Sequence, residues 1–258
     1  MGYRTTAIVA LLALAFAAVA CSSSSSTASI LPEGEGGVYL ALGDSIAEGE
    51  NASDPERADY VALVFDALQA RYGGSLRLES LAVGGHTTQD LIEQQLPRAL
   101  DFLRNGDVRI VTLTIAGNDL YVLAEDPVCP TAPQDPACPF EDIVAATEGR
   151  LDTILRELRN AGPETAVVIQ AYPNLFSGSG HTFEGPAEFS FGRLNDVIEE
   201  VAARHDLVVA DPREEFEGRS AELTGIFDSP ANFHPNDAGY QIITAAFLQA
   251  LGLSGQAP

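Results

Sequence analysis

The chain has 258 residues, of which 37 are Asp or Glu and 14 are Lys or Arg, and its formal net charge is −23. Binding to nucleic acid or to an anionic lipid surface requires a basic footprint, so this charge argues against both classes of partner. The length suffices for one domain with a sizeable hydrophobic core.

Residues 1–20 have the pattern of an export signal, because Arg4 is the only early charge and small apolar residues run from 7 to 20. Residues 18–21, Ala-Val-Ala-Cys, resemble the lipobox of bacterial lipoproteins, with alanine at the usual leucine position. Cys21 is therefore predicted to be lipidated, and ordinary cleavage after residue 20 is the alternative. We expect an extracytoplasmic protein, either a cell-surface lipoprotein or secreted, whose only link to a membrane is this lipid.

Residues 21–36, rich in serine and glycine, predict a flexible tether before a folded domain over 37–253 and a short tail over 254–258. Apolar runs in the domain alternate with longer amphipathic stretches. Strands are predicted near 37–42, 76–83, 108–116, 165–172 and 207–211. Helices are predicted near 55–72, 88–104, 141–160, 186–205 and 235–251, with Asp54 capping the first and Pro97 kinking the second. This alternation indicates a three-layer α/β/α sandwich with a central, mostly parallel five-stranded sheet, as in flavodoxin-like folds.

Two long excursions interrupt the alternation, and both follow the carboxyl ends of strands. The first, about 122–139, contains Cys129 and Cys138 among four prolines, and two nearby cysteines in an exported protein predict a disulfide. The second, about 172–191, carries Phe176 and Phe183 among glycines. Long loops at this edge often form lids or binding walls, while docking of the phenylalanines onto the core is the alternative.

Four short polar motifs lie at element boundaries. They are Gly43-Asp44-Ser45, Gly84-Gly85-His86, Gly117-Asn118-Asp119 and His234-Pro235-Asn236. Three of them end predicted strands, at the edge where open α/β sheets bind ligands. Together they contain a hydroxyl nucleophile, backbone and amide donors for an oxyanion, and a histidine that can act as a general base.

These four motifs, in this order and spacing, resemble the conserved blocks of the SGNH (GDSL-type) hydrolases over about residues 37–252. The resemblance implies that Ser45 is the nucleophile, that His234 is the general base, and that the Ser45 N–H, the Gly85 N–H and the Asn118 amide bind the oxyanion. Gly84 is the rival to Gly85 if the register differs by one residue. His86 is expected to line the substrate pocket.

One position departs from the family pattern. The family usually has aspartate three residues before the histidine, where this chain has Ala231. The first hypothesis is that the backbone carbonyl of Ala231 or a neighbour accepts the imidazole N–H. The second is that Asp228 folds back to take the role, and Asp211 is a weaker third choice.

The resemblance implies a serine esterase that hydrolyses carboxylic esters through an acyl-enzyme, with no metal and no cofactor. We expect a small-molecule or lipid ester as substrate, held in part by Phe176 and Phe183, and a monomeric protein. Two alternatives stay open, a carbohydrate O-deacetylase of the same family and a catalytically inactive surface binding lipoprotein.

Overall fold

Five strands form one sheet in the computed structural model, which describes residues 30–125, 127–229 and 232–254. The strands are β1 (Gly37–Gly43), β2 (Leu76–Ser80), β3 (Val108–Thr114), β4 (Ala166–Gln170) and β5 (Val208–Ala210). Their order is β2-β1-β3-β4-β5, and each neighbouring pair is parallel. The predicted signal peptide, Cys21 and most of the tether and tail lie outside the described residues.

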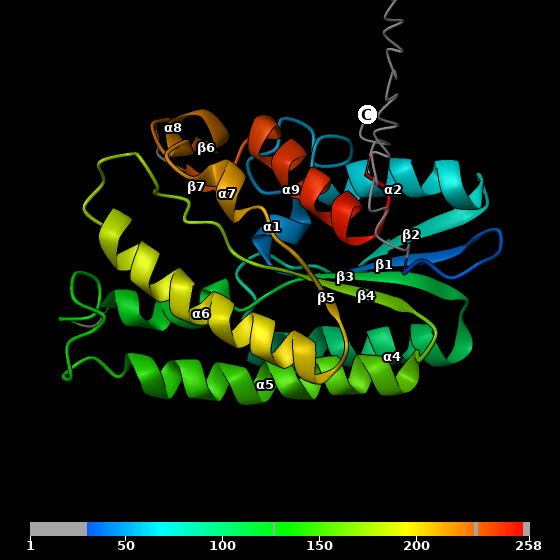
Figure 1. Cartoon of the computed structure of the whole chain (residues 1–258), viewed down its shortest axis with the longest axis horizontal. Helices are drawn as coiled ribbons and strands as arrows, with labels where there is room; N and C mark the ends of the chain where they lie inside the picture. The colour runs from blue at the N-terminus through cyan, green and yellow to red at the C-terminus, as the bar shows by residue number, and fades with distance from the viewer. Residues whose placement is uncertain (1–29, 126, 230–231, 255–258) are drawn as a thin grey trace, which may run out of the picture.

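Helices cover both faces of this sheet, as Figure 1 shows. On one face lie α2 (Tyr60–Tyr72) and α9 (Asp237–Ala250), and on the other lie α4 (Leu96–Asn105), α5 (Phe140–Ala161) and α6 (Glu184–Arg204). The central strands between these layers are mostly buried, and all five residues of β4 are buried. The predicted three-layer α/β/α sandwich is therefore confirmed, and its sheet is parallel throughout.

Helix α2 begins later than the sequence predicts. Asp54 was expected to cap it, but Asp59 is the N-cap, and its Oδ1 accepts the Ala62 N–H at 2.6 Å. Continuous burial begins at Asp59 and Tyr60, whereas residues 53–57 are exposed turns. The helix thus begins where its residues can pack on the core, because packing stabilises a helix more than propensity does.

The predicted helix near 88–104 consists of three pieces. They are α3 (Thr88–Asp90), a π-helical stretch η1 (Leu91–Gln95) and α4. The Leu96 N–H bonds to the Leu91 carbonyl, which is the wider π register. Pro97 was expected to kink the helix, but it lies in the first turn of α4, where a missing N–H breaks no bond. The irregularity therefore lies just before the proline.

The C-terminal region adds short elements that the sequence analysis did not predict. They are α7 (Arg213–Phe216), α8 (Ser220–Leu223) and an antiparallel pair of strands, β6 (Thr224–Gly225) and β7 (Asn232–Pro235). Asn236 caps α9 by accepting the N–H groups of Ala238 and Gly239 at 3.0 and 3.2 Å. His234 consequently lies on a strand that leads into the α9 cap.

The two predicted excursions differ in outcome. Cys129 and Cys138 are joined by a disulfide, as predicted. The second excursion is shorter than expected, because α6 already begins at Glu184 and includes Phe191. A 3₁₀ helix, η2 (Gly117–Glu125), leads from β3 into the disulfide loop.

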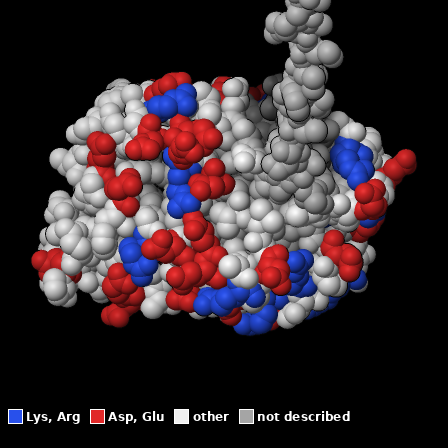
Figure 2. Space-filling view, viewed as in Figure 1, with Lys and Arg blue, Asp and Glu red and all other residues white. Residues whose placement is uncertain are grey.

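Acidic side chains predominate on the face shown in Figure 2, with arginine side chains lying among them. Several arginines form surface ion pairs, such as Arg213 with Glu199 and Arg204 with Glu148. Within the three described ranges, no helix combines the length and apolar character that crossing a bilayer requires.

Candidate active site

Ser45 occupies the turn at the carboxyl end of β1, where it begins the short helix α1 (Ser45–Glu48). Gly43 has φ +144° and lies so close to the Thr114 carbonyl that a Cβ would collide with it. Only glycine fits both conditions. Asp44 caps α1, and the Tyr172 hydroxyl donates a hydrogen bond to its carboxylate. The turn is therefore fixed at the two residues that precede the serine.

The Ser45 hydroxyl faces the imidazole of His234. Its Oγ lies 2.7 Å from Nε2, although the two residues are 189 positions apart in sequence. The Ser45 residue is 7% exposed and the His234 side chain 26% exposed. A serine hydroxyl is a weak nucleophile until an adjacent base can take its proton, and this contact supplies that base.

The other ring nitrogen, Nδ1, has two oxygen neighbours. The Asn232 Oδ1 lies 2.7 Å from it and also accepts the backbone N–H of His234 at 3.1 Å. The Glu50 Oε1 lies 3.4 Å from the same nitrogen. Sequence analysis named neither residue, although Glu50 follows the nucleophile by only five positions and Asn232 precedes the histidine by two.

Neither of the two aspartates that the sequence offered as a partner for Nδ1 is bonded to the ring, and the first hypothesis, the carbonyl of Ala231 or a neighbour, stays a prediction. No hydrogen bond among the described residues joins Asp228 to His234, and the exposed Asp228 bonds through its N–H to the Gly225 carbonyl. The carboxylate of Asp211 pairs with Arg213. Ala231 lies outside the described residues. Asp228 is therefore corrected to Asn232, because the β7 turn brings the asparagine amide to the ring first.

Two backbone N–H groups are available to form an oxyanion site next to Ser45. The Ser45 N–H has no partner within α1, because it is the first residue of that helix. Gly85 lines the same cavity with φ +79°. The N–H of its rival, Gly84, already donates to the Glu48 carboxylate at 2.8 Å. Gly85 is thus the glycine available to a ligand.

The Asn118 side chain lies at the carboxyl end of β3 and lines the cavity. Its Nδ2 donates one hydrogen to the His86 carbonyl at 3.0 Å, which orients the amide and leaves its second N–H for a ligand. The ring of His86 bonds to the Gln95 side chain at 3.0 Å and does not line the cavity. His86 was expected to line the pocket, but it does not line this cavity, because Gln95 holds its ring and its carbonyl orients the Asn118 amide.

A buried carboxylate joins the second and third motifs. Asp119 accepts the backbone N–H of Thr88 at 2.8 Å, the Thr88 hydroxyl, and an Arg150 N–H at 3.0 Å. The Arg150 Nε also donates to the Thr88 hydroxyl oxygen at 2.7 Å. Sequence analysis gave Asp119 no role. Its network fixes the start of α3 against η2, and hence Gly85 against Asn118.

Burial sets the protonation of the groups around the nucleophile. It lowers the pKa of His234 from its ordinary value, and the nearby Glu50 carboxylate opposes this in part. The imidazole is therefore neutral near pH 7 and can accept a proton. Burial also raises the pKa of Asp44 to about 7, although the hydrogen bond from Tyr172 acts in the opposite direction.

A cavity of about 650 Å³ opens above Ser45 and His234, and its walls are mainly apolar. Its apolar side chains are Ile46, Tyr121, Leu175, Phe176, Phe191 and Phe233. The rings of Phe176 and Phe233 pack with centroids 4.9 Å apart. Phe176 therefore lies where the sequence placed it, whereas Phe183 lines a smaller adjoining cavity of about 180 Å³.

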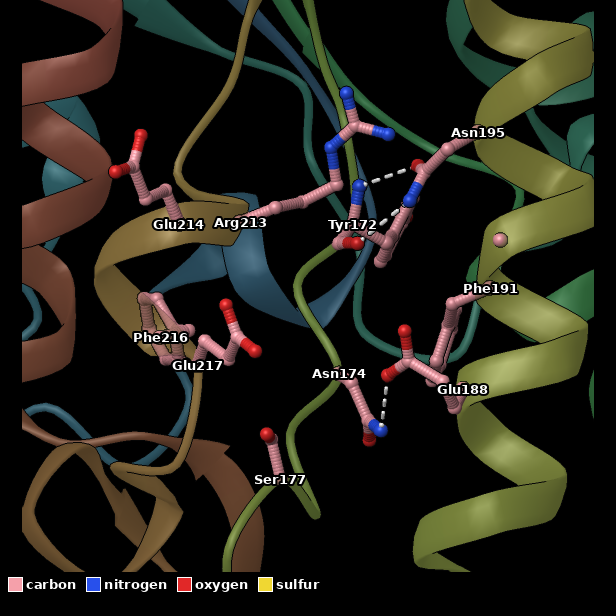
Figure 3. A pocket seen from close by; sticks show the side chains of 11 residues that line it. Tyr172, Asn174, Ser177, Glu188, Phe191, Asn195, Arg213, Glu214, Phe216 and Glu217 are labelled. Carbon is pink, nitrogen blue, oxygen red and sulfur yellow. Dashed lines mark hydrogen bonds between the residues drawn. The ribbon is translucent and has the colours of Figure 1, made fainter.

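A polar cavity of about 300 Å³ lies on the other side of Tyr172 and Phe191, which line both (Figure 3). In it the Asn174 amide donates to the Glu188 carboxylate at 2.9 Å. The side chains of Arg213, Glu214 and Glu217 come from α7 and the turn that follows it. The site thus has an apolar side and a polar side.

A sequence profile described as the GDSL-like Lipase/Acylhydrolase family matches residues 41–242, which include all four motifs. The chain belongs to this family. It is an ester-bond hydrolase with the GDSL-like fold, as its motifs indicated. Among its described residues, no group of three or more His, Cys, Asp or Glu side chains is arranged to hold a metal ion.

One curated relative and several solved structures resemble this GDSL-like hydrolase at low sequence identity. An uncharacterized protein, YpmR of Bacillus subtilis (strain 168), is 23% identical over 230 residues, covering 84% of this chain and 82% of YpmR. An extracellular lipase from Streptomyces rimosus has a similar structure, with a TM-score of 0.61 and 21% identity over 83% of this chain and 99% of the lipase.

Two further solved structures share the fold of this GDSL-like hydrolase. A phospholipase A1 from Streptomyces albidoflavus NA297 gives a TM-score of 0.62 and 23% identity, over 83% of this chain and 99% of the phospholipase. An acetylxylan esterase from Geobacillus stearothermophilus gives a TM-score of 0.63 and 19% identity, over 85% of this chain and 95% of the esterase. Their identities are low enough that the likeness concerns the fold and leaves the substrate open.

Proposed function

We propose that this hydrolase is a serine esterase that cleaves carboxylic esters with apolar acyl groups through an acyl-enzyme. The observation that carries the proposal is the 2.7 Å contact between Ser45 Oγ and His234 Nε2 at the base of a mainly apolar cavity. The hydroxyl, the base and the donors for an oxyanion all line that cavity.

The first half of the reaction forms the acyl-enzyme. Ser45 Oγ attacks the ester carbonyl carbon while His234 Nε2 takes the hydroxyl proton. The negative charge on the carbonyl oxygen is met by the N–H groups of Ser45 and Gly85 and by the Asn118 amide. The ester C–O bond then breaks, and the imidazolium returns the proton to the leaving alcohol.

The second half releases the acid. His234 takes a proton from a water molecule, whose oxygen attacks the acyl-enzyme carbonyl, and the same three donors stabilise the second oxyanion. Collapse of that intermediate breaks the bond to Ser45 Oγ, which recovers its proton from the imidazolium.

The acyl group is the part of the substrate that the apolar side fits. Phe176 and Phe191 line both the main cavity and the adjoining one that contains Phe183. Apolar side chains of this kind stabilise each buried methylene by about 0.8 kcal/mol, so longer acyl chains gain affinity until the cavities are filled. We therefore propose medium-chain esters as better substrates than acetates.

The test is hydrolysis of p-nitrophenyl esters from acetate to palmitate by the purified domain. We expect kcat/KM to rise from acetate to a medium-chain ester, and Ser45→Ala to abolish the activity. A fluorophosphonate probe should label Ser45 in the wild type. A protein that hydrolyses no ester and takes no label would instead be the surface binding lipoprotein.

The polar cavity of Figure 3 favours a second candidate function, a carbohydrate O-deacetylase. Its carboxylates and amide beside Phe191 could hold the hydroxyl groups of a sugar while a small acetyl group reaches Ser45. The discriminating experiment compares acetylated xylo-oligosaccharides with p-nitrophenyl octanoate. A kcat/KM that is higher on the acetylated sugar would reverse our choice.

The protein is proposed to act outside the cytoplasm, as a monomer, attached by a lipid on Cys21 or released after cleavage. The apolar stretch before Cys21 and the serine-rich segment after it support this location. Mass spectrometry of the mature N-terminus distinguishes the two forms, and light scattering of the domain gives its oligomeric state.

A further inference from the structure

We propose that Glu50 is the acidic positioning residue of this active site. Its carboxylate stabilises the positive charge that His234 acquires during the reaction, while Asn232 holds the neutral ring in the reactive tautomer. This inference rests on the proposed function, since it assigns the group that supports the catalytic base. The role that an aspartate at position 231 would fill alone is thereby divided between two residues on different elements.

The two oxygens at Nδ1 differ in what they can do. The amide oxygen of Asn232, at 2.7 Å, accepts the Nδ1–H and so leaves Nε2 free to accept the Ser45 proton. An amide carries no net charge and gains little when the ring becomes positive. The Glu50 carboxylate, at 3.4 Å, carries the charge that the imidazolium needs.

The backbone of Glu50 is held in place next to the nucleophile. Its N–H donates to the Ser45 carbonyl at 2.9 Å, and the Tyr240 hydroxyl of α9 donates to its carbonyl at 2.8 Å. Glu50 also lines the main cavity. The half-exposed carboxylate therefore extends toward His234 from a backbone that is fixed next to the nucleophile.

The next residue fastens this turn to the strand that carries the base. Asn51 has φ +71°, in the left-handed region, and its Nδ2 lies 3.1 Å from the His234 carbonyl and 3.3 Å from the Pro235 carbonyl. Two positions later, Ser53 donates its N–H and hydroxyl to Asp237 at 2.8 and 2.6 Å. The acid and the base are thus held together without a substrate.

Among the described residues, Glu50 is the carboxylate that lies next to the His234 ring. Its other neighbours are the neutral Ser45 and Asn232 side chains, and Glu50 is the charged group that raises the pKa of His234 against burial. The Glu50 side chain is 49% exposed, so water screens the interaction and the effect on the rate is moderate.

The test uses Glu50→Gln, Glu50→Asp and Asn232→Ala in the p-nitrophenyl ester assay, with kcat and kcat/KM measured from pH 4.5 to 8.5. Glu56→Gln is the matched control. Glu56 is an exposed acid in the same segment, and its replacement removes the same charge. Thermal unfolding of each variant checks that the comparison is made between folded proteins.

For Glu50→Gln we expect kcat to fall about tenfold with KM unchanged, since a partly screened charge is lost from the transition state. The ascending limb of kcat/KM should move to lower pH, because the carboxylate no longer favours the imidazolium. Glu50→Asp should restore part of kcat and part of the pH position of the limb. Asn232→Ala should lower kcat, because the ring is no longer held in the tautomer with its proton on Nδ1.

The assignment is overturned if Glu50→Gln matches Glu56→Gln in both kcat and the pH of the limb, or if its losses disappear after correction for the folded fraction. Labelling of wild-type Ser45 by the fluorophosphonate separates this failure from failure of the proposed function. A labelled, active enzyme that is indifferent to Glu50 refutes only the role of Glu50.

Discussion

Replacing Asp119 by alanine tests whether the second and third motifs are held together by one buried charge. The side chain of Asp119 is 1% exposed and accepts hydrogen bonds from Thr88, Thr147 and Arg150. Its removal leaves the Arg150 guanidinium and the Thr88 N–H without their main acceptor. We expect lower stability and lower turnover together.

The magnitude follows from the burial of the two partners. Removing one partner of a buried ion pair costs about 3–5 kcal/mol. Arg150 is 29% exposed and regains some hydration, which places the expected loss near the lower end, about 3 kcal/mol. With a urea m-value of about 3 kcal/mol/M, the unfolding midpoint should fall by about 1 M.

The assay is urea unfolding of the wild type, Asp119→Ala, Arg150→Ala and the double variant. The double variant should lose less stability than the sum of the two single variants, by about 2 kcal/mol, because neither charge is then left unpaired. Asp66→Ala is the control, an exposed α2 acid whose loss should change stability by at most about 0.5 kcal/mol. A loss below about 1 kcal/mol, or strict additivity, would refute the reasoning.

Three further predictions concern the cavity, the buried acid and the disulfide. Phe176→Ala should lower the ratio of kcat/KM on octanoate to that on acetate about tenfold, and an unchanged ratio would remove Phe176 from the acyl site. Burial raises the pKa of Asp44 from 3.8 to about 7, so the folded state holds a proton that the unfolded state releases. Stability should therefore fall as the pH rises from about 4 to 7, and Asp44→Asn should flatten this slope of the melting temperature; equal slopes would contradict the assignment. Replacing Cys129 and Cys138 by serine should lower the free energy of unfolding by about 2–3 kcal/mol, given their separation of 9 residues, with acetate turnover nearly unchanged. A large loss of acetate turnover in the folded variant would mean that the loop supports the catalytic groups.

The sheet could be predicted from sequence because its strands carry their own signal. The runs that became β3 and β4 are β-branched and nearly continuous, as expected for strands covered on both faces. The convergence of the motifs followed in turn, since the carboxyl ends of parallel strands meet at one edge. The His234 motif ends no predicted strand, and its contact with Ser45 was expected from the family resemblance instead.

The partner of the histidine was not accessible in the same way. Asn232 reaches Nδ1 only because β7 pairs with β6 and turns its side chain back beside the ring. Glu50 reaches it because the turn after α1 lies against β7, a tertiary contact with no periodic signature. Contacts between side chains that turns bring together have no regular sequence spacing from which they could be predicted.

The helix starts show a second limit. Asp54 and Asp59 both have cap chemistry, and Pro55 made the earlier one the better choice by local rules. Asp59 is the cap instead, because the residues from Asp59 onward are the ones buried against the core. The π-helical stretch was missed for a related reason, since one added residue in a turn barely alters an apolar pattern.

That stretch has a consequence for exchanging segments between homologues. The side chain of Gln95 binds both the N–H and the carbonyl of Gly43, at 2.9 and 2.7 Å, just before the nucleophile. The Gly43 carbonyl also accepts the Val83 N–H at 3.1 Å, whereas Gln95 is the acceptor for the Gly43 N–H. A chimera that received residues 84–105 from another member would need an amide at the position of Gln95, or the buried Gly43 N–H would lose its acceptor just before the serine.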